Sequence, residues 1–213
     1  MAVNTDRIYL GLVPTIRPLV AAAARRRLRA FEAEERADGR VLFLGDSITH
    51  WGQWDVLFPE LATLNRGING DTTQDVLARL DEALQNPVAV SLLIGTNDLH
   101  TNRRLKEPQG IVSRLEQIIV RIRMKAPGVP IFINSITPRT PWFAPRIRSL
   151  NEQYADVARR TGCTYVDLWP ALADDAGGLR TELTKDNLHL IEPGYQAWRD
   201  VLRPLLRPFA LER

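Results

Sequence analysis

The sequence predicts an α/β fold in which helices cover both faces of a parallel sheet. From Arg40 onward, short apolar runs alternate with longer amphipathic stretches, and this alternation is typical of right-handed βαβ crossovers. The first of these runs, Val41–Leu44, has no polar alternation, as expected of a strand that is buried on both faces. The chain has 213 residues and no glycine- or serine-rich linker, so we expect a single domain.

Five segments are the expected strands. Val41–Leu44 is a continuous apolar run, and the segment that begins at Val88 is the clearest buried strand. The second segment in the chain is the weakest candidate. In chain order the expected strands are Val41–Leu44, Leu61–Leu64, Val88–Ile94, Pro130–Ile136 and Thr164–Leu168.

Amphipathic stretches between these segments predict the helices. Asp71 and Gln74 have the spacing of an N-cap residue and its capping-box partner, and an apolar stripe from Val76 to Leu84 follows them. The other expected helices are Ile111–Met124, Pro145–Thr161 and Tyr195–Leu206.

Residues 1–40 precede the first strand, and we expect them to form a helical extension packed on the same domain. The cluster Arg25, Arg26, Arg27 and Arg29 is followed closely by glutamates. Glu32 and Arg36 have the favourable i, i+4 orientation on a helix. The arginine cluster therefore indicates a solvated helix face and not a patch for an acidic partner.

The N-terminal stretch has only some features of a secretory signal. The stretch Ile8–Ala24 is apolar and ends in alanines, but Pro14, Arg17 and Pro18 interrupt it and the basic residues follow it. A secretory signal has the reverse order, so we expect a cytoplasmic protein, with secretion as the alternative. No window approaches the roughly 18 apolar residues of a membrane span.

Composition narrows the possible partners and cofactors. The net charge is only +3, from 28 basic and 25 acidic residues, which is a poor electrostatic footprint for nucleic acid. A single cysteine, Cys163, excludes an intramolecular disulfide and a cysteine-based zinc site. The three histidines are His50, His100 and His189.

Polar residues follow each expected strand. In an open parallel sheet, ligands bind beyond the carboxyl ends of the strands, so these loops are the expected site. The long irregular segment after the last strand, residues 170–193, is of a kind that is usually functional or disordered. In strand order the loops carry Ser47, then Asn65 and Gly67, then Asn97, then Arg139, and finally Asp186 with His189.

These residue types suit acyl transfer. Ser47 is the candidate nucleophile, and a serine hydroxyl needs an adjacent base such as His189. Asp186, three residues earlier, can hold the imidazole tautomer. Each residue alone has an ordinary structural explanation, such as a helix cap or a turn. Their coincidence on separate loops at one edge favours catalysis.

An oxyanion hole is the remaining requirement of this chemistry. The backbone N–H groups of Ser47 and Gly67 and the side-chain amide of Asn97 are the expected donors. Loss of one such donor typically costs about 2.7–4 kcal/mol of transition-state stabilisation.

Four motifs together resemble the GDSL esterase/lipase group of the SGNH hydrolases, and within it the platelet-activating-factor acetylhydrolase type. The resemblance covers most of residues 41–213, the expected hydrolase domain. It implies a flavodoxin-like three-layer α/β/α sandwich with a five-stranded parallel sheet, a Ser47–His189–Asp186 triad, short acyl chains such as acetyl, and no cofactor or metal. The motifs are Gly45-Asp46-Ser47-Ile48-Thr49, Asn65-Arg66-Gly67-Ile68-Asn69-Gly70-Asp71, Gly95-Thr96-Asn97-Asp98 and Asp186-Asn187-Leu188-His189.

Further residues near the motifs are candidates for the substrate pocket. Of Trp51 and Trp54, one is expected to pack in the core and the other to line the pocket. The two arginines in this set are expected to be solvated, with a role in the pocket as the alternative, and Asp46 is interpreted as structural. Asp98 stands where the acetylhydrolase type tends to carry a second asparagine. The candidate pocket residues are Trp51, Arg66, Arg139 and Trp142.

The resulting hypothesis is a cofactor-free serine esterase that acts on small acetyl or other short-chain esters. A homo-oligomer is compatible with this hypothesis. Acyl transfer to an alcohol acceptor is the first alternative. A metallophosphoesterase is disfavoured because its two-metal site normally recruits several imidazoles, and the chain has three histidines in all. A non-catalytic binding module is disfavoured because every expected catalytic side chain is present.

Overall fold

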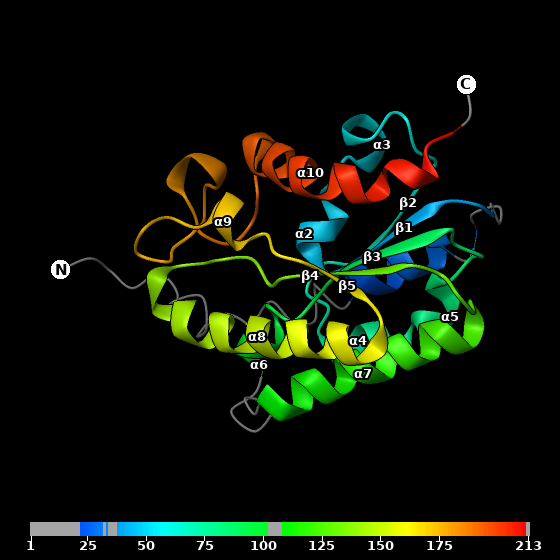
Figure 1. The fold of residues 1–213 in the computed structure, drawn as a ribbon, viewed down its shortest axis with the longest axis horizontal. Helices are drawn as coiled ribbons and strands as arrows, with labels where there is room; N and C mark the ends of the chain where they lie inside the picture. The colour runs from blue at the N-terminus through cyan, green and yellow to red at the C-terminus, as the bar shows by residue number, and fades with distance from the viewer. Residues whose placement is uncertain (1–21, 32, 34–37, 102–107, 212–213) are drawn as a thin grey trace.

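The computed structural model describes residues 22–31, 33, 38–101 and 108–211. Its centre is a sheet of five strands, all parallel, in the order β2-β1-β3-β4-β5. Helices cover both faces (Figure 1). The α/β class and the three-layer arrangement expected from the sequence are therefore confirmed. The strands are β1 Val41–Gly45, β2 Thr63–Gly67, β3 Ala89–Leu93, β4 Ile131–Asn134 and β5 Thr164–Val166.

The second strand begins two residues later than the sequence predicts. The expected run was Leu61–Leu64, whereas β2 is Thr63–Gly67. Among the described strands, β2 lies at the edge of the sheet and pairs with β1. Its residues alternate between buried and half-buried positions at its start. A search for continuous apolar runs misplaces such a strand, because only one of its faces needs apolar side chains.

Two hydrophobic cores lie on opposite faces of the sheet. Along β1, Leu42 and Leu44 belong to one core, and Val41 and Phe43 belong to the other, as the two-residue period of a strand requires. In Figure 1, α4, α5, α7 and α8 lie on one side of the sheet, and α3 and α10 on the other. The helices are α2 Ser47–His50, α3 Trp54–Leu57, α4 Thr73–Ala78, α5 Leu80–Ala83, α6 Asp98–Thr101, α7 Pro108–Lys125, α8 Ala144–Thr161, α9 Trp169–Leu172 and α10 Glu192–Leu206.

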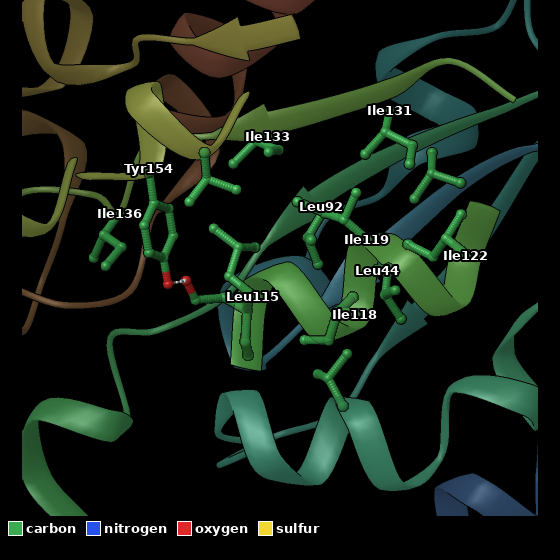
Figure 2. Packing of buried hydrophobic residues seen from close by; sticks show 14 of the residues in the cluster. Leu44, Leu92, Leu115, Ile118, Ile119, Ile122, Ile131, Ile133, Ile136 and Tyr154 are labelled. Carbon is green, nitrogen blue, oxygen red and sulfur yellow. Dashed lines mark hydrogen bonds between the residues drawn. The ribbon is translucent and has the colours of Figure 1, made fainter. Parts of the chain in front are cut away.

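Helix α7 shows how one apolar stripe builds the first core. Leu115, Ile118, Ile119 and Ile122 recur at helical spacing and are fully buried. Figure 2 shows them against side chains from β1, β3 and β4. This packing confirms the helix predicted over Ile111–Met124, which extends slightly further at both ends.

The helix predicted after Asp71 differs in two ways. Its capping box is formed by Thr72 and Asp75 and not by Asp71 and Gln74. Asp71 is unavailable because its carboxylate accepts a hydrogen bond from Arg79 Nε at 2.6 Å. The helix is also divided into α4 and α5 at Arg79, whose φ of −106° and ψ of 15° depart from helical values.

Part of the N-terminal extension contacts the edge of the sheet. Residues 22–31 are helical, and Phe31 is buried, with the guanidinium groups of Arg27 and Arg66 over its ring at 4.9 and 4.3 Å. Arg25, Arg26 and Arg29 are exposed, as expected for a solvated helix face. The apolar stretch before residue 22, and the glutamates and Arg36 after Phe31, lie outside the described residues.

Trp54 is the centre of the second core. It stacks on Phe43, with ring centroids 4.0 Å apart, and its edge contacts Trp198 at 4.8 Å. Its Nε1 donates to the Thr49 carbonyl at 3.0 Å, which ties α2 to the core. Of the two candidate tryptophans, Trp54 is therefore the packing residue.

We predict that Trp54→Ala lowers the free energy of unfolding by about 3–5 kcal/mol, because it leaves a large cavity between α3, α10 and the sheet. Chemical denaturation measures the change. Trp51→Ala is the matched control, since Trp51 is 50% exposed, and it should cost less than about 1 kcal/mol. Equal losses for the two variants would contradict the assignment of Trp54 to the core.

Candidate active site

The candidate nucleophile stands at a tight turn from strand to helix. β1 ends at Gly45, and Ser47 is the first residue of α2. A Cβ atom at Gly45 would lie 2.1 Å from the Leu93 carbonyl oxygen, so only glycine permits this approach. Asp46 caps α2, and its Oδ1 accepts from the Ile48 N–H at 2.9 Å, in agreement with the structural role expected of it.

Ser47, His189 and Asp186 lie in a hydrogen-bonded row. Ser47 Oγ is 3.0 Å from His189 Nε2, and His189 Nδ1 is 2.6 Å from Asp186 Oδ2. Residues that are 142 positions apart thus meet at the carboxyl edge of the sheet. The structure brings together the three side chains that the sequence nominated.

The turn that carries Asp186 and His189 is fixed by its own hydrogen bonds. Asp186 Oδ1 accepts from the backbone N–H groups of Leu188 at 3.0 Å and of His189 at 2.8 Å. Thr184 Oγ1 donates to the His189 carbonyl at 2.7 Å. Asn187 adopts the left-handed conformation, with φ of 60°, which asparagine tolerates better than most residues. The three-residue spacing therefore suffices to bring the carboxylate to the imidazole.

The same contacts control the charge of Asp186. Partial burial alone would raise its pKa, but hydrogen bonds from the His189 ring and from backbone N–H groups outweigh burial and hold the pKa below its usual value. An ionised Asp186 favours the imidazole tautomer with hydrogen on Nδ1, so Nε2 faces Ser47 as an acceptor.

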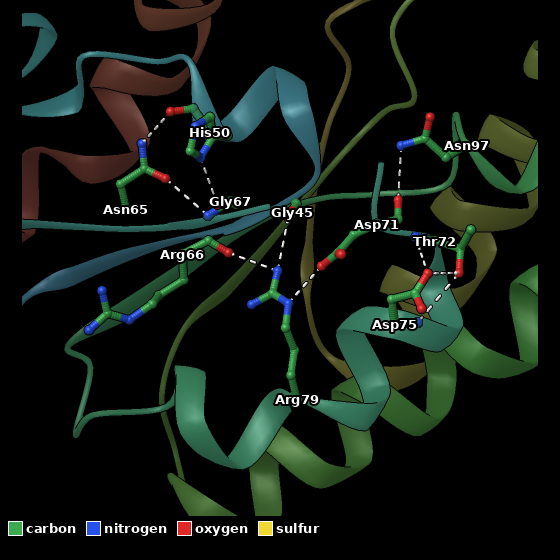
Figure 3. Close-up of polar contacts among 10 residues, drawn as sticks. All are labelled: Gly45, His50, Asn65, Arg66, Gly67, Asp71, Thr72, Asp75, Arg79 and Asn97. Carbon is green, nitrogen blue, oxygen red and sulfur yellow. Dashed lines mark hydrogen bonds and ion pairs between the residues drawn. The ribbon is translucent and has the colours of Figure 1, made fainter. Parts of the chain in front are cut away.

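Asn97 lies across the same edge, after β3. It is largely buried, and its Nδ2 donates to the Asp71 carbonyl at 2.9 Å (Figure 3). That bond sets the plane of the amide at the end of β3, one strand away from the Ser47 turn on β1.

Gly67 does not match its expected role as an oxyanion donor. Its N–H donates to Asn65 Oδ1 at 3.0 Å, so it is directed into the protein. A Cβ atom at Gly67 would lie 2.2 Å from the His50 backbone nitrogen. Glycine is needed here because α2 lies directly on β2, and the sequence pattern alone did not distinguish this packing requirement from a catalytic one.

Asp98 holds the start of α4 in place through hydrogen bonds and does not line a pocket. Its carboxylate accepts from the Thr73 N–H at 2.9 Å, the Thr73 hydroxyl at 2.6 Å and Arg114 Nη2 at 3.2 Å. Burial raises the pKa of Asp98, while the hydrogen bonds from Thr73 and Arg114 lower it. Asp98 thus fastens the start of α4 to α6 and α7.

Of the four candidate pocket residues, Trp51 lies at the triad. Its ring stacks on His189, with centroids 4.5 Å apart and planes 25° apart. Trp142 is 62% exposed and contacts Phe143 edge-on. No contact between Trp142 and the triad is found within the described parts of the chain.

The two arginines correct the expectation of solvated side chains. Arg66 is 1% exposed and Arg139 is 2% exposed. Each packs over an aromatic ring at 4.3 Å, Arg66 on Phe31 and Arg139 on Phe143. The Arg66 side chain therefore lies against the N-terminal helix, and not with the triad.

A groove of about 450 Å³ runs beside the triad, between α3 and α10. Trp51 lines it, as does Leu190, the residue after His189. Val56 and Ile191 add apolar surface, and Arg199 adds a cation. No local sequence pattern predicts this groove, because its walls come from two helices far apart in the chain.

Among the described residues, no group of three or more histidine, cysteine, aspartate or glutamate side chains is placed to hold a metal ion. His50, a metal candidate in the disfavoured alternative, has its Nδ1 3.1 Å from the Gly67 carbonyl. Within the described ranges, no helix has both the length and the apolar composition to cross a membrane.

Known proteins share this fold and parts of this sequence. Platelet-activating factor acetylhydrolase IB subunit alpha2 of Homo sapiens is 38% identical over 106 residues, which cover 46% of this chain and 44% of that protein. Subunit alpha1 of Rattus norvegicus is 29% identical over 78% of this chain and 74% of that protein. The match to the alpha2 subunit thus spans less than half of its length.

A solved structure extends the comparison over nearly the whole chain. It is a protein from Streptococcus pneumonia described as a platelet activating factor, with a TM-score of 0.83 and 27% identity. The match covers 91% of this chain and 97% of that one.

The fold and the row of Ser47, His189 and Asp186 define the class: an α/β protein with the side-chain arrangement of a serine hydrolase. Residues 43–197 match the GDSL-like Lipase/Acylhydrolase family. The chain belongs to that family.

We predict that Asp46 makes the stability of the protein depend on pH. Burial raises its pKa from 3.8 to about 7, so the folded state binds this proton more tightly than the unfolded chain. The resulting stabilisation is complete below about pH 3.8 and is lost as the pH rises through 7. Asp46→Asn keeps an oxygen for the Ile48 N–H and removes the titration. The free energy of unfolding of Asp46→Asn should therefore rise relative to that of the wild type as the pH increases from 4 to 8.

Urea denaturation across this pH range measures the difference. Asp81→Asn is the control, because Arg121 holds the pKa of the exposed Asp81 below its usual value. The pH dependence then has the opposite sign. The free energy of unfolding of Asp81→Asn should fall slightly relative to that of the wild type as the pH rises through the usual aspartate range. A constant difference between Asp46→Asn and the wild type would refute the prediction.

Proposed function

We propose that this protein is a serine esterase that hydrolyses acetyl or other short-chain esters through an acyl-enzyme. The observation that carries the proposal is the row of side chains from Asp186 to Ser47, with separations of 2.6 and 3.0 Å. Both distances allow direct proton transfer. Membership of an acylhydrolase family supports the same chemistry.

Acylation begins with attack of Ser47 Oγ on the ester carbonyl carbon. His189 Nε2 takes the hydroxyl proton, and the Asp186 carboxylate stabilises the imidazolium that forms. When the tetrahedral intermediate collapses, the C–O bond to the alcohol breaks and Nε2 gives its proton to the leaving oxygen. Water then repeats the sequence on the acyl-enzyme, releasing the carboxylic acid and restoring Ser47.

Three N–H groups are proposed to stabilise the oxyanion. Two are the Ser47 backbone N–H and the Asn97 amide, which the Asp71 carbonyl orients. Because the Gly67 N–H is committed to Asn65, Gly70 replaces it as the proposed third donor. Gly70 is exposed on the same loop and has a positive φ of 82°, and no acceptor for its N–H is found among the described residues.

The position of His189 defines the side on which the alcohol lies. A leaving oxygen must reach His189 Nε2 to be protonated, so the alcohol portion lies toward Trp51 and the groove between α3 and α10. The acyl portion then lies toward Asn97. The acetylhydrolase names of the sequence relatives support a short acyl group.

We predict that Ser47→Ala lowers kcat for p-nitrophenyl acetate by about 10⁴-fold or more, because the nucleophile is lost. Circular dichroism should show an unchanged fold, since the variant removes only the Ser47 hydroxyl, whose partner is the His189 imidazole. Exhaustive chelation of the wild type is the control and should leave activity intact. Turnover retained by Ser47→Ala would refute the serine mechanism, and loss on chelation would favour a metal-dependent esterase.

The acyl preference is tested separately with p-nitrophenyl esters from acetyl to octanoyl, which share one alcohol. We expect kcat/KM to fall at least about tenfold beyond butyryl, the equivalent of about 1.4 kcal/mol of transition-state binding. A flat or rising series would contradict a short-chain substrate while leaving the esterase assignment in place.

A further inference from the structure

One buried arginine lies beneath the loops that carry the proposed oxyanion donors. Arg79 stands between α4 and α5, and its side chain is almost fully buried. Its Nε donates to Asp71 Oδ2 at 2.6 Å, and its Nη2 donates to the carbonyls of Gly45 at 3.1 Å and Arg66 at 2.9 Å. Figure 3 shows the three bonds diverging from one guanidinium group.

Each acceptor of Arg79 is adjacent to a part of the proposed site. Gly45 ends β1 two residues before Ser47. Arg66 is the second-to-last residue of β2, just before the loop that leads to Gly70. Asp71 uses its carboxylate for Arg79 and its backbone carbonyl for Asn97. One rigid planar group therefore ties the turn after β1 to the segment after β2, and Asp71 in turn links that segment to Asn97 after β3.

The charge of Arg79 has its own effect. Burial raises the pKa of Asp71 to about 6, and the contact with Arg79 opposes that rise. Without the guanidinium, Asp71 is left as a buried carboxyl with no cation, and its turn loses the partner that holds it. Arginine suits this position because its fork of donors reaches several acceptors at once, which a lysine ammonium does less well.

We propose that Arg79 is a positioning residue for the oxyanion hole, holding the Ser47, Gly70 and Asn97 donors in register without touching the substrate. The proposal rests on the esterase function proposed above. Preorganised donors stabilise the transition state because they need not reorganise as charge develops. Loosening them should therefore lower kcat and leave ground-state binding nearly unchanged.

A second arginine provides a matched control. Arg123 also donates to three backbone carbonyls, those of Val129, Thr161 and Gly162, at 3.1–3.3 Å. These acceptors precede β4 and β5, so they lie at the amino end of the sheet, opposite the triad. Loss of Arg123 removes similar bonds without disturbing the proposed oxyanion loops.

The experiment compares Arg79→Met, Arg79→Lys and Arg123→Met in the full chain. Denaturation gives the folded fraction, and kcat and KM are measured for p-nitrophenyl acetate. We expect Arg79→Met to lower kcat by roughly 10- to 100-fold with KM within about twofold. Arg79→Lys, which keeps a cation for Asp71, should recover part of this loss. Arg123→Met should keep kcat within about twofold at equal folded fraction.

Labelling of Ser47 by a fluorophosphonate separates failure of this proposal from failure of the proposed function. If the wild type is not labelled, the serine mechanism fails. If the wild type is labelled and folded Arg79→Met is labelled equally fast, only the positioning role fails. A similar loss of kcat in Arg123→Met would also overturn it. Should Arg79→Met not fold, the kcat and labelling rate of Arg79→Lys decide the question.

Discussion

The close approach of α2 to the sheet is the constraint on which the site depends. A side chain at Gly45 would collide with the Leu93 carbonyl, and one at Gly67 would collide with the backbone of His50. Because neither position carries a side chain, α2 packs directly against the ends of β1 and β2. Ser47 then stands where loops from the neighbouring strands converge, and Trp54 anchors the far end of α2 through the Thr49 carbonyl. The rigid sheet supplies precision that the loops alone would lack.

His189, the proposed base, and Asp186, the carboxylate beside it, are held by a different device. Asp186 and His189 lie outside regular secondary structure, in a turn closed by bonds from backbone N–H groups to the Asp186 carboxylate. The same carboxylate therefore builds the turn and orients the imidazole. A turn of this kind explains how a long irregular segment places two side chains accurately, and why the pKa of Asp186 lies below its usual value despite partial burial.

The sequence predicted the fold class because strands buried on both faces leave continuous apolar runs, and it predicted the triad because three residue types fell on loops at one edge. It misplaced β2, where only one face is buried. It also expected Arg66 and Arg139 to be solvated, since nothing local shows that a guanidinium will pack on Phe31 or Phe143. Such contacts depend on tertiary structure, as does the stacking of Trp51 on His189.

The segment from Asn65 to Asp71 has two halves with different roles, and the sequence alone does not show in which half Gly67 acts. In the first half, Asn65 Nδ2 lies 3.1 Å from the carbonyls of Thr49, His50 and Gly52, and its Oδ1 accepts from Gly67. This half holds the end of α2. The second half turns outward through Gly70 to Asp71, whose carbonyl orients Asn97. Two glycines three residues apart thus meet different needs: Gly67 admits a neighbouring backbone, and Gly70 permits a left-handed turn.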